Sequence, residues 1–187
     1  MDMPFGEIYR VRLRSLEWAA AMLRELRHSA DADAVSISVN WALDGVYDLW
    51  EAYRLASSSR DKLPAQDELL IQQSGMKVGA LLFIRGEKTH RAKRVDGPNP
   101  FRGLQYDFAD LTHWAWADVT SDTPAFQQRA TWCNQFVRHR PLWVPLEEAW
   151  YWFLTNSPIK IIGQDPREVP GWVHHISLVQ ANNLPAL

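Results

Sequence analysis

The 187-residue sequence contains one cysteine, Cys133, which excludes an intrachain disulfide and any zinc site built from several cysteines. No apolar run approaches the roughly 18 residues that a bilayer span requires, so the sequence predicts no membrane-spanning helix. Residues 1–18 lack the apolar segment of a secretion signal. Internal repeats and low-complexity tracts are absent as well. We therefore expect an ordinary globular protein of the cytoplasm.

The sequence also lacks an excess of charge of either sign. Its 20 Lys and Arg residues against 22 Asp and Glu residues give a net charge of -2, which argues against a basic coat for nucleic acid but allows a local basic patch. The hydrophobic fraction of 47% is typical of a globular chain. At about 150 residues per domain, the length predicts one domain with an appendage.

Tryptophan, in contrast, is abundant. The chain has 10 of them, and most follow residue 110. Two interpretations are open: a compact core filled by a few large rings, or a surface where rings bind a ligand or stack on bases. The tryptophans beyond residue 110 are Trp114, Trp116, Trp132, Trp143, Trp150, Trp152 and Trp172.

Apolar residues three and four positions apart predict three helices in the first half of the chain. They cover residues 9–26, 35–53 and 69–94, and the Asp-Gly-Pro-Asn-Pro run at 96–100 ends the third. We expect residues 1–96 to form an antiparallel helical bundle with local connections. Within the third helix, Gly75 and Gly79 favour the close approach of a neighbouring helix.

The pattern changes after residue 100. Alternating apolar residues predict a short β-hairpin or extended arm near residues 104–119. Helices are expected from 123 to 141, with Cys133 as a buried inert thiol, and from about 145 to 156. Glu147 and Glu148 suit the first turn of the latter, where the helix dipole favours acids. The fold class is mainly α, with a bundle (1–96) and a Trp-rich extension (97–187) packed on the same core.

The most concentrated charge lies in residues 85–94, where five basic residues against one acid give a net charge of +4. Such a patch attracts phosphates. The alternative is a solvated helix end, because the helix dipole favours cations in the last turn. The basic residues are Arg85, Lys88, Arg91, Lys93 and Arg94.

Within this segment Arg85 and His90 form an Arg-x4-His pair at the end of a predicted helix that follows an up-down helical pair. In this arrangement, residues 7–96 resemble the HEPN superfamily (higher eukaryotes and prokaryotes nucleotide-binding). The resemblance implies a homodimer in which Arg85 and His90 line a shared cleft. Because residues five positions apart on a straight helix point about 140° apart, we expect Gly86 to loosen the last turn.

The resemblance also implies a metal-independent endoribonuclease that needs no cofactor. The ribose 2'-hydroxyl would attack the adjacent phosphate and leave a 2',3'-cyclic phosphate. His90 would transfer the proton and Arg85 would stabilise the charge on the phosphoryl oxygens. Such activity commonly serves toxin-antitoxin systems or antiviral defence, so an antitoxin or regulatory protein is a further expected partner. The residues expected to guide the RNA backbone are Lys88, Arg91, Lys93 and Arg94.

Two other functions stay open. A non-catalytic HEPN-like module would bind nucleotide, RNA or a protein partner through the same patch. It is favoured by Gly86, where the family often has a polar residue, and by Ala92, where a related toxin group often has tyrosine. The other alternative is a helical protein whose Trp-rich half binds a small ligand or a partner.

A polar strip on the second predicted helix has two interpretations. It is either a plain solvent face, or it meets the basic helix end of a second subunit and orients His90. The strip consists of Asn40, Asp44, Tyr47 and Asp48.

Overall fold

The computed structural model describes residues 5–56, 64–86, 92–95, 113–119 and 127–159. These residues are mainly helical, which confirms the predicted α class. A short two-stranded sheet accompanies the helices. The elements are α1 (Phe5–Glu25), the 3-10 turn η1 (Leu26–His28), α2 (Ala32–Ala56), α3 (Pro64–Gln73), α4 (Met76–Gly86), β1 (Ala92–Val95), β2 (His113–Trp116), α5 (Gln127–Phe136) and α6 (Trp143–Thr155).

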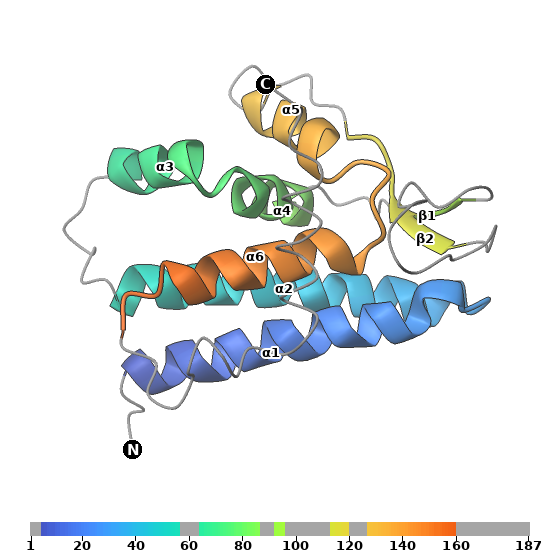
Figure 1. The fold of residues 1–187 in the computed structure, drawn as a ribbon, viewed down its shortest axis with the longest axis horizontal. Helices are drawn as coiled ribbons and strands as arrows, with labels where there is room; N and C mark the ends of the chain where they lie inside the picture. Colours follow the sequence, from blue (N-terminus) through green and yellow to red (C-terminus); the bar gives the residue numbers. More distant parts are fainter. Residues whose placement is uncertain (1–4, 57–63, 87–91, 96–112, 120–126, 160–187) are drawn as a thin grey trace, which may run out of the picture.

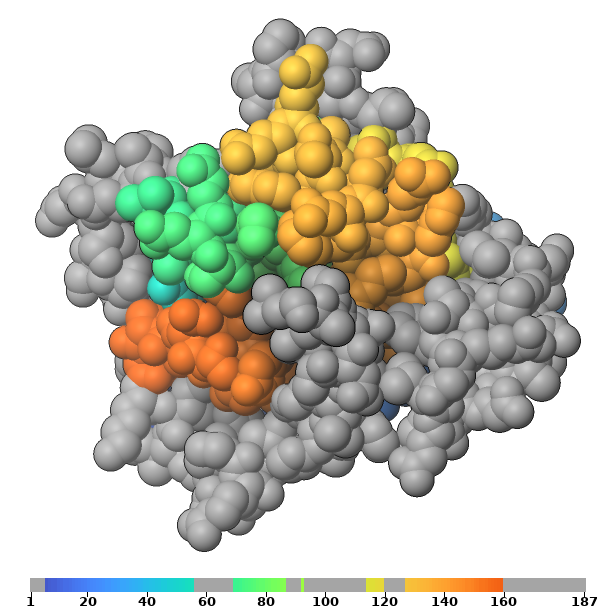
Figure 2. All heavy atoms as spheres, turned by 45° about the horizontal axis from the view of Figure 1, so that its top comes forward, coloured from blue at the N-terminus to red at the C-terminus, as the bar shows by residue number. Residues whose placement is uncertain are grey.

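The helices form two layers. In the first, α1 and α2 make an antiparallel hairpin and α6 lies along it (Figure 1). In the second, α4 packs on α2 and α6 and carries α5 on its other side, while α3 precedes α4. Helices α3, α4, α5 and α6 share the face of the molecule turned to the viewer in Figure 2.

The predicted apolar stripes form the core. On α1, residues at helical spacing from Tyr9 to Leu23 are buried, and α2 contributes the matching stripe from Val35 to Trp50. Both halves of the chain supply one continuous hydrophobic cluster. The compact-core interpretation holds for the tryptophans beyond residue 110 that the structure describes, whereas Trp172 lies outside the described residues. Those buried are Trp114, Trp116, Trp132, Trp150 and Trp152, with Trp143 partly buried against them.

Buried aromatic side chains also join distant parts of the chain through hydrogen bonds. The Trp114 indole donates to the carbonyl of Ser29 at 2.8 Å and so attaches β2 to the turn before α2. The Tyr9 hydroxyl donates to the carbonyl of Phe153 at 2.6 Å and joins α1 to α6. Burial raises the pKa of Tyr9, so this donor stays protonated at neutral pH. Each ring therefore fixes one crossing between elements.

The prediction of a single helix over residues 69–94 is wrong in two respects. The segment forms two helices, α3 and α4, separated by Ser74 and Gly75, and α4 ends at Gly86. At the break, the Trp152 indole of α6 donates to Ser74 Oγ at 3.1 Å, a contact that local periodicity does not reveal. Further along, residues 92–95 form strand β1, because β2 supplies antiparallel partners for their backbone.

The arm expected near residues 104–119 is found in part. Strand β2 lies within that stretch, but its partner is β1, with Ala92 opposite Trp116, rather than another strand of the same stretch. Residues 104–112 lie outside the described part of the chain. On its other side, β2 bonds to the α5–α6 turn: the amide of Trp116 donates to the carbonyl of Arg140 at 3.0 Å, and the amide of His139 donates to the carbonyl of Trp116 at 2.9 Å.

The two helices predicted for the second half are present, with altered bounds. α5 is described from residue 127, and residues 120–126 lie outside the described part. Cys133 is buried on its apolar face, as predicted, and its thiol donates to the carbonyl of Ala80 at 3.3 Å. α6 begins at Trp143, two residues before the expected start.

Gly75 and Gly79 allow neighbouring helices to approach closely, as predicted. A methyl group on Gly75 would lie 3.2 Å from the Trp152 ring. One on Gly79 would lie 2.6 Å from a methyl of Ile71 and 3.0 Å from the Trp132 ring. Because tryptophan rings are rigid and Ile71 is branched next to its backbone, α5 could not keep its position against a larger residue at Gly79.

We predict that Gly79→Ala destabilises the fold. Alanine raises helix propensity by about 1 kcal/mol, but overpacking of this kind costs about 1–3 kcal/mol. The control is Gly86→Ala, because a methyl group there meets no atom within 4 Å. Urea unfolding should give a lower free energy of unfolding for Gly79→Ala and an unchanged or higher value for Gly86→Ala. Equal values would contradict the packing argument.

Candidate functional site

Arg85 is the first predicted site residue that the structure places. It lies in the last turn of α4, directly after the buried residues Phe83 and Ile84. Its side chain is 39% exposed, and its Nε donates to Asp44 Oδ1 of α2 at 3.1 Å. The guanidinium carbon lies 4.0 Å from the centroid of the Tyr47 ring, within cation–π range. Arg85 is therefore held at the surface of α2 in one orientation.

Asp44 and Tyr47 meet Arg85 together because of helix geometry. They are three residues apart on α2, so they share one face of it. α4 crosses α2 with its apolar side inward, and this leaves Arg85 at the edge of the contact. Asn40, one turn earlier on α2, is half-buried. Asp44 and Tyr47 of the polar strip thus contact the basic helix end of their own chain.

The remaining predicted RNA-binding and catalytic residues are described only in part. Lys93 and Arg94 lie on β1, where their backbones pair with Ala115 and Trp114. Lys93 and Arg94 are therefore part of the sheet that lies beside the α5–α6 turn. Lys88, His90 and Arg91 lie outside the described residues.

A second polar cluster, inside the molecule, was missed at the level of sequence. The expectation that Glu147 and Glu148 are first-turn residues of a helix is wrong: α6 begins at Trp143, so both lie in its second turn. Both are buried, at 4% and 6% exposure, among the apolar residues that α6 turns to the core. A dipole effect at a helix start therefore does not account for them.

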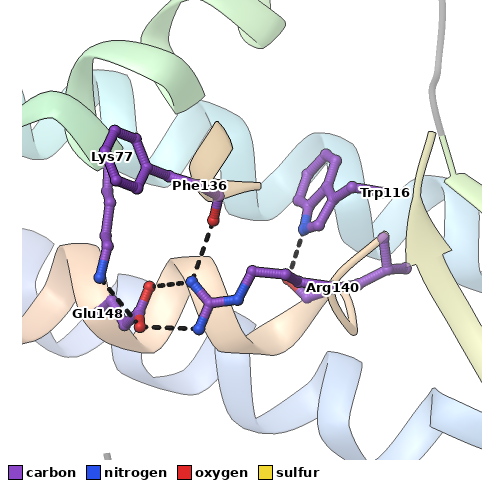
Figure 3. Close-up of polar contacts among 6 residues, drawn as sticks. Lys77, Trp116, Phe136, Arg140 and Glu148 are labelled. Atoms are coloured by element: carbon purple, nitrogen blue, oxygen red, sulfur yellow. Dashed lines mark hydrogen bonds and ion pairs between the residues drawn. The ribbon is translucent and has the colours of Figure 1, made fainter. Parts of the chain in front are cut away.

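Glu148 is neutralised by two cations from other elements (Figure 3). Arg140, from the α5–α6 turn, forms a bidentate pair with it, at 2.6 Å from Nη1 to Oε2 and 2.8 Å from Nη2 to Oε1. Lys77, at the start of α4, places its Nζ 3.1 Å from Oε1. Arg140 also donates to the carbonyl of Phe136 at 3.0 Å, which attaches the end of α5 to the cluster.

Glu147 points about 100° around α6 from Glu148 and forms an ion pair with Arg24 of α1. Burial lowers the pKa of Arg24, because removing the guanidinium from water disfavours its charged form. The negative charge of Glu25 acts in the opposite direction and raises this pKa, and the Glu147 carboxylate pairs with the buried cation. Together, Glu147 and Glu148 attach α6 to α1, α4 and the α5–α6 turn.

This buried cluster is suited to holding the helices in place rather than to chemistry. The Glu148 side chain is 3% exposed and both of its oxygens are taken by cations, so a substrate would have to displace them. A sequence signal does exist: two adjacent acids interrupt an otherwise apolar helix of tryptophan, phenylalanine and leucine. Periodicity alone, however, does not identify the distant Arg140, Lys77 and Arg24 as partners.

A third polar group lies on the α5–α6 turn. Asp118 forms an ion pair with Arg138, and His139 Nε2 lies 3.5 Å from the same carboxylate oxygen. All three side chains are about half exposed. His139 has a φ of 60°, a left-handed conformation that it adopts where α5 ends and the chain turns back to β2. The group lies beside the α5 C-terminus, whose dipole disfavours anions.

Among the described residues, no three or more His, Cys, Asp or Glu side chains gather in a way that could hold a metal ion. No helix in the described part of the chain combines the length and apolarity needed to cross a membrane. Comparison of the chain with family models, curated proteins and solved structures gives no match.

We predict that removing the charge of Glu148 destabilises the fold strongly. Glu148→Gln keeps the side-chain shape but leaves Arg140 and Lys77 partly buried without their anion, which costs about 3–5 kcal/mol. The matched control is Asp118→Asn, which removes an exposed ion pair and should cost at most about 1 kcal/mol. Thermal and urea unfolding measure both. A loss of the same size in the two variants would contradict a central role for Glu148.

Proposed function

We propose that this chain is a metal-independent endoribonuclease of the HEPN type, acting on RNA through Arg85 and His90. The observation that carries the proposal is the environment of Arg85. A partly exposed guanidinium at the end of a helix in a helical bundle is oriented by a carboxylate and an aromatic ring. Phosphate recognition benefits from a fixed fork of donors, which such restraint provides.

The reaction requires a group that moves a proton and a group that accepts developing negative charge. A histidine such as His90 is the side chain best suited to take up and release a proton near neutral pH. It takes the proton from the 2'-hydroxyl or gives one to the leaving 5'-oxygen. Arg85 contacts Asp44 through Nε, and in this proposal its two terminal nitrogens bind the phosphoryl oxygens. The products are a 2',3'-cyclic phosphate and a 5'-hydroxyl.

The local charge supports a polyanionic substrate. The segment from Arg85 to Arg94 has a net charge of +4 in a chain of net charge -2. Lys88, Arg91, Lys93 and Arg94 contact the phosphates without reading bases. Because the attack uses the 2'-hydroxyl, DNA competes for binding but is not cleaved. In the family this chemistry serves toxin-antitoxin systems and antiviral defence, and we propose the same setting here, with an antitoxin or regulatory protein as restraint.

The proposal predicts cleavage of a labelled single-stranded RNA in EDTA, with cyclic phosphate at the new 3' ends. His90→Ala should lower the rate by about 10²–10⁴, the usual contribution of a proton-transfer group. Arg85→Ala should lower it by about 10²–10³, the usual contribution of a charge-stabilising donor. The matched controls are His139→Ala and Arg138→Ala, which remove an exposed His and Arg elsewhere and should retain full activity.

A different outcome would favour the second candidate, a non-catalytic module. Gly86 and Ala92 depart from the active members of the family and favour this reading. In that case wild type and variants are equally inert over a broad RNA panel, but RNA is retarded in a binding assay. Binding would weaken steeply with salt as phosphate contacts are lost, and less steeply in Arg85→Ala. If RNA is neither cleaved nor bound, both readings fail.

We also predict a positioning role for Asp44. Asp44→Asn keeps a polar side chain of similar size but removes the charge that orients Arg85. The rate of cleavage should fall about ten- to a hundredfold, mainly in kcat, because a displaced guanidinium stabilises the transition state less well. The free energy of unfolding should change by less than about 1 kcal/mol, because the pair is exposed. An unchanged kcat would remove Asp44 from the site.

A further inference from the structure

Two tryptophans of the α1–α2 hairpin are exposed to solvent. Trp18 of α1 is 61% exposed and Trp41 of α2 is 40% exposed, whereas the described tryptophans beyond residue 110 are buried or partly buried. Met22 follows Trp18 by one helical turn, Ile37 precedes Trp41 by one, and both are exposed as well. Scattered apolar surface residues need no explanation, but a contiguous group with large rings indicates a binding surface.

The two rings lie at the same level of the hairpin. The register of its helices follows from two contacts: Arg12 pairs with Asp48 at 2.7 Å, and Ser38 Oγ donates to Met22 Sδ at 3.5 Å. In each pair the residue numbers add up to 60. The numbers of the two exposed tryptophans add up to 59, so the rings are next to each other on helices whose axes lie about 8–10 Å apart.

Trp41 continues the Arg85 site along α2. It precedes Asp44 by three residues, so the two side chains are neighbours on one side of the helix. Asp44 in turn accepts the hydrogen bond from Arg85 Nε, and its carboxylate is 63% exposed. A phosphate held by the terminal nitrogens of Arg85 would lie one to two helical turns from Trp41, or about 5–10 Å along α2. One nucleotide can span that distance between its phosphate and its base.

A second arginine lies at the far end of this surface, on α1. The guanidinium carbon of Arg14 is 6.0 Å from the centroid of the Trp18 ring, at the limit of cation–π range. From α4 over α2 to α1, the surface therefore presents an arginine, two rings and another arginine. We call this series the aromatic track, and it consists of Arg85, Trp41, Trp18 and Arg14.

The charges beside the track suit a polyanion, although α2 is acidic. Each acid at the level of the track lies next to an arginine. The pairs are Asp44 with Arg85, Asp48 with Arg12, and Glu17 with Arg14, which precedes it by three residues. Arg10, one helical turn before Arg14, gives the arginines an excess of one. A polyanion that crosses the hairpin here therefore meets carboxylates that arginines already neutralise.

We propose that the aromatic track binds single-stranded RNA and extends the Arg85 site across the hairpin. Bases stack on Trp41 and Trp18, while Arg85 and Arg14 contact phosphates at the two ends. Rings beside cations bind single strands of any sequence, because every base has a π-face. A duplex keeps its bases stacked inside, so the substrate class is unpaired RNA. The inference rests on the proposed function, since it takes Arg85 as the residue that binds phosphate.

The length of the track predicts how many nucleotides it holds. The path from α4 over α2 to α1 covers two helix spacings, or about 16–20 Å. At about 3.4 Å for each stacked nucleotide, about six nucleotides reach from one arginine to the other. A tetranucleotide bound at Arg85 reaches Trp41 but stops short of Trp18. The two rings therefore contribute to affinity at different lengths of RNA.

The test is equilibrium binding of labelled oligoadenylates to the full chain in EDTA, by fluorescence anisotropy, with His90→Ala in every protein so that no RNA is cleaved. Trp41→Leu should weaken binding of a tetranucleotide and of an octanucleotide about five- to a hundredfold, the usual loss for one stacked base. Trp18→Leu should weaken only the octanucleotide. Trp41→Phe and Trp18→Phe should restore most of the affinity. The matched control is Leu69→Ala on α3, which alters another exposed apolar residue and should change neither affinity.

Two further measurements separate stacking from charge. An abasic octanucleotide has the phosphates but no rings, so the leucine variants should bind it as tightly as the reference protein does. Arg14→Ala should weaken binding of both octanucleotides and reduce the dependence of log affinity on log salt by about one phosphate contact. The leucine variants should leave that salt dependence unchanged.

The proposal is overturned if both leucine variants keep the wild-type helix content and bind octaadenylate as tightly as the reference protein. Equal affinity for octaadenylate, its abasic counterpart and a duplex would overturn it too. Leucine variants that change the molar mass in sedimentation, while RNA binding stays the same, would assign the surface to a protein. Cleavage that depends on His90 without ring-dependent binding would leave the nuclease proposal standing alone. Ring-dependent binding by a wild-type chain that cleaves no RNA would leave the aromatic track standing alone.

Discussion

The architecture depends on the neutralisation of one buried carboxylate. Glu148 lies in the interior of α6, where an unpaired charge would be very costly, and its oxygens contact Arg140 and Lys77. These partners come from the turn that follows α5 and from the start of α4. The pairing therefore fixes three segments at once, and Glu147 adds α1 through Arg24. Hydrophobic packing supplies most of the driving force for folding, but it is not directional. The ion pairs select one arrangement of helices that are otherwise similarly apolar.

Helix α4 connects the buried ion pairs of Glu148 to the surface. Its first turn carries Lys77, which is bound to α6, and its last turn carries Arg85, which is bound to α2. Between them, Gly79 allows the Trp132 ring of α5 to approach the backbone. A shift of α4 along α6 would thus move Arg85 away from Asp44 and Tyr47. The position of the proposed phosphate-binding arginine is in this sense set by packing about two turns away, and β1 continues the chain from that site to the sheet.

The two sides of the α1–α2 hairpin have different roles. The inner side is buried beneath α4 and α6 and holds the core, including Tyr9 and its hydrogen bond to Phe153. On the outer side, Trp18 and Ile37 are 61% and 68% exposed. Asp44 and Tyr47 lie along the margin between the Arg85 contact and this outer side.

The amino-acid sequence by itself determined the helices whose apolar residues recur every three or four positions, because such a stripe can be buried only if the segment is helical. This holds for α1 and α2. The burial of Cys133 and the close approach at Gly79 also followed from the sequence. The strand at 92–95 and the break at Ser74 were decided by tertiary structure, since each depends on a partner far away in the chain. The same is true of Glu147 and Glu148, which resemble ordinary helix-start acids until Arg24, Lys77 and Arg140 come near. Arg85 was identifiable as a candidate from its spacing to His90, but its restraint by Asp44 and Tyr47 arises only when α4 crosses α2.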